Sequence, residues 1–153
     1  MYIPQSFVVT DRKEIVSFIK ANAFGQLVSL VGGRLFSSHL PFFLGNDEQS
    51  LICHMAKRNP QWEGIENQEV LVTFQGPHDY VSPSWYFSPG VPTWNYQAVH
   101  VYGKPKLITE ARAVKSIVDE FTRIHEASFE NPWEPEYKES LLNVIIGIEI
   151  KIT

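Results

Sequence analysis

Residues 91–103 read VPTWNYQAVHVYG, and this stretch decides the fold because its second half has the alternating pattern of a β-strand. In a strand over residues 96–108, one face carries Tyr96, His100 and Tyr102, whereas the other carries valines. A row of Tyr, His and Tyr is too polar for the core face of a sheet. It is typical of a ligand wall or of a dimer interface.

The segments on both sides of this strand predict a mainly β, antiparallel fold with flanking helices. Residues 146–152 alternate isoleucine with glycine or charged residues, which is the pattern of a half-buried strand. Gly32 and Gly33 predict a tight hairpin turn. The expected strands are 26–31, 34–43, 50–55, 70–75, 96–108 and 146–152, and the expected helices are 11–25, 59–67 and 110–126.

Residues 76–93 contain four Pro and two Gly, and we expect them to form an irregular loop that is either functional or merely covering. We expect this loop and the elements on either side of it to form one domain over residues 1–153. We expect this domain to be an antiparallel barrel of about six strands with helices on its outside.

Composition excludes several classes of protein. The 153 residues carry a net charge of -4 and no Lys/Arg run longer than two, so direct DNA binding is disfavoured. A single cysteine, Cys53, excludes an internal disulfide and a four-thiolate zinc site. Residues 1–5 lack the pattern of a signal peptide, and no apolar run is long enough to span a membrane. We therefore expect a cytoplasmic protein.

Two short clusters carry candidate binding groups. In residues 37–41, Ser37 and His39 share one face of a strand, where they either bind a polar ring or form ordinary structural hydrogen bonds. Residues 54–62 read HMAKRNPQW, so Lys57 and Arg58 lie where a strand ends and a helix begins. Two cations beside helical N–H groups favour a phosphate, although an exposed basic turn is the ordinary alternative.

Catalytic and metal sites receive little support. Ser82 or Ser84 with His78 and Asp79 supplies the residue types of a serine hydrolase. However, adjacent His and Asp side chains point in different directions, and the glycine pattern of a nucleophile elbow is missing. The histidines lack the spacing of metal ligands. We therefore expect neither a catalytic residue nor a metal site.

The sequence resembles the PaiB-like family, described as FMN-binding negative transcriptional regulators of the flavin split-barrel superfamily. The resemblance covers essentially the whole chain, and it is most specific at residues 91–103. It is carried by residues 1–4, 38–41, 59–62, 74–78, 84–86, 92–96, 98–103 and 147–150. Residues 87–90 diverge from the family pattern, and members usually continue past the closing strand, so we expect a domain shortened at its C-terminus.

This resemblance implies a split barrel of the flavin-reductase and pyridoxamine-oxidase type, forming a homodimer with FMN sites at its interface. It implies that His39 and Leu40 lie beside the isoalloxazine ring, with Trp94 and Tyr96 contributed by the other subunit and Gln75 as a further contact. The residues implied around the ribityl chain and phosphate are His54, Met55, Ala56, Lys57, Arg58 and Asn59.

Three functions remain open at this point. The resemblance favours an FMN-binding regulator without turnover, and whether such a protein binds DNA directly is undecided. The alternatives are a flavin-dependent oxidoreductase acting on a small substrate and a haem-binding barrel, because split barrels host all three and a fold does not decide a function.

Overall fold

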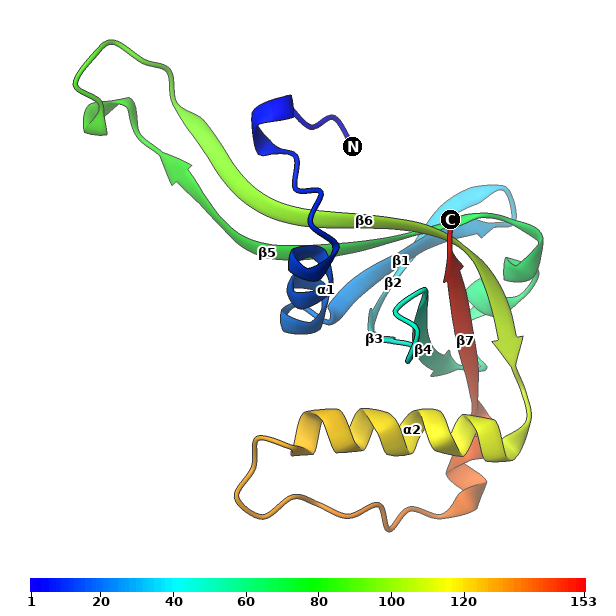
Figure 1. Cartoon of the computed structure of the whole chain (residues 1–153). Coiled ribbons are helices and arrows are strands. Elements are labelled where there is room, and N and C mark those ends of the chain that lie inside the picture. The colour runs from blue at the N-terminus through cyan, green and yellow to red at the C-terminus, as the bar shows by residue number, and fades with distance from the viewer.

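The strands pair into a seven-stranded sheet in the order β2-β1-β5-β6-β7-β4-β3, and every pairing described is antiparallel (Figure 1). The computed structural model describes residues 1–153, apart from the side chain of Glu139. The strands are β1 (Phe24–Val31), β2 (Arg34–Pro41), β3 (Phe43–Leu44), β4 (Ser50–Ala56), β5 (Val70–Val81), β6 (Thr93–Ile108) and β7 (Ile145–Ile152). The helices are α1 (Arg12–Ala21) and α2 (Ala111–Glu126), with 3-10 turns η1 (Gln5–Phe7), η2 (Pro60–Trp62), η3 (Ile65–Asn67), η4 (Pro83–Trp85) and η5 (Glu139–Val144).

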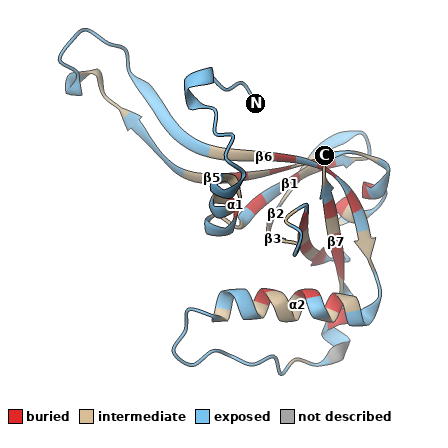
Figure 2. Ribbon diagram, viewed as in Figure 1, coloured by how far each residue is buried: buried red, intermediate tan, exposed pale blue. Residues whose placement is uncertain are grey.

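Alternation along the strands produces the core. On β4, the side chains of Leu51, Cys53 and Met55 are buried and those between them face outward, as the sequence predicts. The core also contains the inward side chains of the other strands, which are Leu27, Val70, Val72, Phe74, Val101, Ile146, Ile148 and Ile150. Figure 2 shows these buried stretches along β1, β4 and β7.

The buried side-chain amide of Gln61 connects η2 to the sheet. Gln61 is fully buried, and its Nε2 donates to the backbone carbonyl of Leu27 at 2.9 Å and to Ser29 Oγ at 3.0 Å. The carbonyl oxygen of Phe36 lies 3.3 Å from the same nitrogen. Because these acceptors belong to β1 and β2, Gln61 fixes the segment after β4 against the opposite side of the barrel.

Helix α2 covers the outer face of β4 and β7. Phe121 makes edge-to-face contacts with Phe43 and His54, at centroid distances of 4.8 and 5.2 Å. A Cβ added to Gly147 would lie 2.6 Å from Ile117 Cδ1, so glycine permits the close approach of helix and strand. Of the helices described, none has the length and apolar character needed to cross a membrane.

The expected helix 11–25 ends at Ala21, and the expected strand 34–43 ends at Pro41 before β3. Two further segments differ more strongly from the structure. Residues 59–67 form two 3-10 turns instead of one helix, because Gly64 takes a left-handed conformation with a φ of 70° between them. Residues 76–93 are not one irregular loop, since β5 continues to Val81 and β6 already begins at Thr93. The prediction for this stretch was wrong because Pro and Gly were taken to end the strand.

The extended part of this hairpin projects beyond the barrel as an arm, defined here as residues 77–97 (Figure 1). Most of its surface is exposed (Figure 2). Its exposed apolar side chains include Tyr80, Trp85, Tyr86, Phe87, Val91, Trp94 and Tyr96. Exposed apolar surface gathered in this way is typical of interaction sites in proteins.

Candidate functional site

Four polar side chains form a row across neighbouring strands. Gln26 of β1 pairs with His39 of β2 on one side and with Thr73 of β5 on the other. Thr73 in turn pairs with His100 of β6. Residues in register across a sheet project from the same face, so this row runs along the outer face of β2, β1, β5 and β6.

A β-bulge extends this polar surface toward the arm. Gln75 pairs with Ala98 and His78 pairs with Tyr96, so three steps along β5 match two steps along β6. Strand alternation alone would place Gln75 and His78 on opposite faces, but one extra residue restores them to the same face. The bulge therefore brings His78 beside Gln75 and Tyr96.

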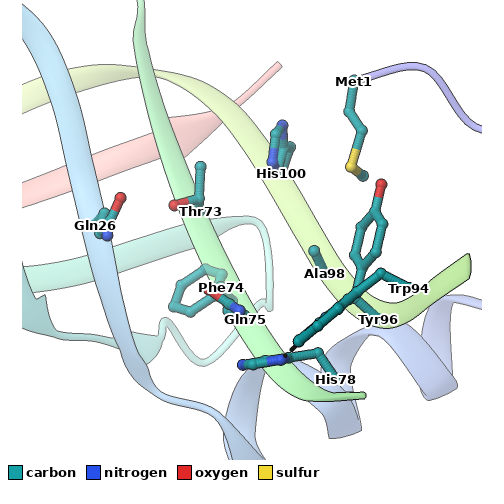
Figure 3. A pocket seen from close by; sticks show the side chains of 10 residues that line it. All are labelled: Met1, Gln26, Thr73, Phe74, Gln75, His78, Trp94, Tyr96, Ala98 and His100. Carbon is teal, nitrogen blue, oxygen red and sulfur yellow. Dashed lines mark hydrogen bonds between the residues drawn. The ribbon is translucent and has the colours of Figure 1, made fainter. Parts of the chain in front are cut away.

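These side chains line a cavity of about 530 Å³ between the polar row and the base of the arm (Figure 3). Its lining residues are Met1, Gln26, Thr73, Phe74, Gln75, His78, Trp94, Tyr96, Ala98 and His100. Aromatic faces and a few polar groups are typical of a site for a flat, polar ligand, and the volume suits one. None of these lining residues is Lys or Arg.

Some polar groups of the cavity form hydrogen bonds with other side chains, and one has no partner among the described residues. Trp94 Nε1 donates to His78 Nδ1 at 3.2 Å, so Trp94 and not a serine is the partner of His78. Gln26 Nε2 lies 2.8 Å from His39 Nε2. His100 Nδ1 is buried without a partner among the described residues, and burial lowers the pKa of His100. His100 therefore offers a neutral ring with an unused nitrogen beside the cavity.

The predicted cations lie elsewhere, at the corner that follows β4. Lys57 and Arg58 are exposed there, and Trp62 Nε1 donates to the backbone carbonyl of Lys57 at 2.9 Å. Asn59 has a structural role, because its Nδ2 donates to Ser38 Oγ at 2.8 Å and its Oδ1 accepts from the Gln61 N–H at 3.0 Å. We call residues 57–59 the cation corner.

The structure brings together only some of the predicted site residues. Gln75, Trp94 and Tyr96 line the cavity. His39 is not one of its lining residues, but its Nε2 lies within hydrogen-bonding distance of Gln26, which is. Leu40 is half-buried against the core, Met55 is a core residue, and Ala56 is exposed at the end of β4. His54 lies under α2 against Phe121. The predicted binding residues did not include the other residues of the cavity wall, and the strand register would have revealed Gln26 and Thr73. These other residues are Met1, Gln26, Thr73, Phe74, His78, Ala98 and His100.

The position of His54 predicts a pH-dependent stability. Burial lowers the pKa of His54 below its ordinary value of 6.5, and its Nδ1 is buried without a partner among the described residues. As the pH falls below 6.5, His54 binds a proton more readily in the unfolded chain than in the folded protein. The stability that is present above this pH is therefore lost as the pH falls. We expect the free energy of unfolding, measured in urea, to fall less steeply between pH 7 and pH 5 in His54→Leu. Parallel curves for the two proteins would contradict this role.

No group of three or more His, Cys, Asp or Glu side chains among the described residues is arranged to hold a metal ion. The serines of the rejected hydrolase pattern contact each other, with 2.8 Å between Ser82 Oγ and Ser84 Oγ. Asp79 accepts from the backbone N–H of Tyr80. Ser82, Ser84, His78 and Asp79 are therefore not brought together as a catalytic triad.

Comparison with known proteins identifies the family. The model of the family described as "Putative FMN-binding domain" matches residues 1–153. The chain is also 41% identical over 160 residues to "Protease synthase and sporulation protein PAI 2" from Bacillus subtilis, covering 99% of this chain and 77% of that protein. The chain belongs to the PaiB-like FMN-binding family. FMN is the cofactor of this family, as predicted.

Solved structures confirm the predicted fold of this PaiB-like protein. The flavocytochrome Anf3 from Azotobacter vinelandii aligns with a TM-score of 0.75 at 13% identity, covering 94% of this chain and 64% of that chain. The FAD and heme binding protein from Mycobacterium smegmatis aligns with a TM-score of 0.73 at 12% identity, covering 95% and 68%. The fold is a flavin-binding split barrel of the flavin-reductase and pyridoxamine-oxidase type.

The residues present fit FMN in their chemistry. The cavity offers aromatic walls, the amide of Gln75, the hydroxyl of Thr73 and the unpartnered Nδ1 of His100, which suit a flat heteroaromatic ring. Lys57 and Arg58 are exposed cations of the kind that would bind a phosphate dianion. When bound, FMN would supply redox chemistry, and these residues would bind and orient it.

Proposed function

We propose that this PaiB-like protein is a cytoplasmic, FMN-dependent regulator of gene expression that acts as a homodimer with flavin sites shared between its two copies. The proposal rests on one observation. Within one copy, the cavity that suits the flavin ring does not include the cation corner that suits its phosphate. No Lys or Arg side chain lines the cavity, so neither Lys57 nor Arg58 belongs to its wall. A second copy would supply the missing half of each site.

The arm supports this arrangement. Phe87 is fully exposed at its tip, and Trp85 and Val91 are exposed beside it. The arm leaves the barrel next to the cavity, because Trp94 and Tyr96 belong to both. A contact between the arm and a second copy would therefore bury apolar surface beside the flavin site, where aromatic residues stabilise interfaces most strongly.

This arrangement predicts that Phe87→Ser weakens the dimer. Losing one buried aromatic anchor typically costs more than 1 kcal/mol, so we expect the dimer dissociation constant to rise about tenfold. Analytical ultracentrifugation over a concentration series measures it. Phe129→Ser is the matched control, since Phe129 is an exposed aromatic residue in the segment after α2. An equal effect of the two substitutions would contradict the role of the arm.

The regulatory part of the proposal is supported by the relative PAI 2, whose name refers to protease synthesis and sporulation. A net charge of -4 and the lack of any Lys/Arg run longer than two disfavour direct DNA binding. We therefore place its action in flavin-dependent contacts with other proteins. A cytoplasmic location agrees with its one cysteine, Cys53, a free and fully buried thiol.

Three measurements test this function. An absorption spectrum of the concentrated protein, before and after FMN is added, tests cofactor binding, and we expect one FMN per chain. A gel shift with the purified protein at low and moderate salt tests the route of regulation. Tight, sequence-specific DNA binding at moderate salt would overturn the indirect route, and rapid reduction of bound FMN by NADH or NADPH would favour an oxidoreductase.

A further inference from the structure

The hydrogen bond between Trp94 and His78 fixes the chemical form of a histidine in the cavity. An indole N–H is only a donor, so His78 Nδ1, 3.2 Å from Trp94 Nε1, must be the acceptor and carries no proton. A neutral imidazole that accepts at Nδ1 carries its proton on Nε2. The bond therefore selects one of the two neutral tautomers of His78.

Neighbouring rings hold Trp94 in place. The centroids of His78 and Trp94 are 5.8 Å apart with an angle of 31° between their planes. Tyr80 packs against Trp94 at a centroid distance of 6.3 Å. Trp94 is thus held between two rings of β5, and its N–H points at His78 as Figure 3 shows. The tautomer is set before any ligand enters the cavity.

We propose that His78 donates its Nε2–H to an acceptor on the pyrimidine edge of the flavin ring and that Trp94 is the positioning residue that keeps this donor available. The inference rests on the proposed flavin site. Both side chains line the cavity, and the bulge of β5 directs His78 toward it. Among the described residues, none accepts a hydrogen bond from Nε2, so this donor is unused.

The opposite tautomer would present a lone pair to the same ligand atoms. The pyrimidine edge of the flavin offers two carbonyl oxygens and N1 as acceptors, and His78 would face one of these and not the donor N3–H. A lone pair facing an acceptor is repulsive, whereas an N–H forms a hydrogen bond, so the choice of tautomer decides between attraction and repulsion. Stacking by Trp94 alone would be independent of this choice, and the two roles are therefore separable.

The test uses Trp94→Phe, which keeps an aromatic ring beside His78 but removes the N–H. ¹⁵N NMR of the FMN-free protein, labelled at histidine, reports the His78 tautomer. We expect the Nε2–H form in the natural protein and a mixture of both tautomers in Trp94→Phe. FMN fluorescence quenching then gives the dissociation constant, which we expect to rise by the reciprocal of the remaining Nε2–H fraction, about twofold for an equal mixture.

Controls separate the hydrogen bond from packing. His78→Gln keeps an amide donor and should bind FMN within about threefold of the natural protein, whereas His78→Leu removes the hydrogen bond and should raise the dissociation constant about five- to tenfold. Tyr80→Phe leaves the Trp94 N–H untouched and should change neither readout. An unchanged His78 tautomer in Trp94→Phe, or an unchanged FMN dissociation constant, overturns the inference. His78 resonances that do not move on addition of FMN would instead contradict the proposed flavin site, while the tautomer of the FMN-free protein still tests Trp94.

Discussion

Replacing Gln61 by leucine is expected to lower the free energy of unfolding by about 3 kcal/mol, because it leaves buried acceptors on β1 without a donor. The carbonyl of Leu27 and the hydroxyl of Ser29 would each lose a hydrogen bond from a fully buried nitrogen. Water cannot reach these groups to replace the bond, so the cost of desolvation is not recovered. Urea denaturation followed by tryptophan fluorescence measures the loss.

Gln68→Leu is the matched control for this prediction. The side chain of Gln68 also bonds β1, accepting from Leu30 N–H at 2.7 Å and donating to its carbonyl at 3.0 Å. Leu30 is 48% exposed, so water can replace these bonds and we expect a cost below about 1 kcal/mol. Equal losses in the free energy of unfolding for the two substitutions would show that the buried hydrogen bonds of Gln61 do not hold η2 to the barrel.

Patterns that repeat along the chain predicted the fold well. Alternation identified β4 and β7, and the apolar stripe of residues 110–126 identified α2. The bulge of β5 could not be predicted, because one extra residue is visible only when the partner strand is known. For the same reason the arm was taken for a loop, since its pairing partners lie 12 to 18 residues apart in the sequence.

The candidate site was predicted less well because neighbours in sequence are not neighbours in a strand. His54 and Met55 stand next to the cations in the sequence, but alternation directs Met55 into the core and His54 toward α2. Asn59 belongs to the motif that resembles the family, yet its described hydrogen bonds join η2 to β2. Conversely, Gln26 and Thr73 enter the site only through the strand register.

Replacing both Lys57 and Arg58 by alanine is expected to raise the FMN dissociation constant by more than about 100-fold. Hydrogen bonds between charged groups contribute about 1.5–3 kcal/mol each, and the FMN phosphate would lose two cationic donors at once. Both side chains are exposed and neither forms a described ion pair, so their removal should leave the stability of the fold nearly unchanged. Fluorescence titration measures the affinity, and urea denaturation checks the fold.

Riboflavin provides the decisive control for this variant, because it has the same ring and ribityl chain but no phosphate. If the cation corner binds the phosphate, the double variant should bind riboflavin as the natural protein does, and the preference for FMN over riboflavin should disappear. Lys104→Ala with Lys106→Ala removes two exposed lysines of β6 that lie outside the cation corner, and it should preserve that preference. An unchanged FMN affinity in the Lys57 and Arg58 variant would reject the corner as the phosphate site. An equal loss for FMN and riboflavin would mean that the corner shapes the ring site instead, since only the phosphate distinguishes the two ligands.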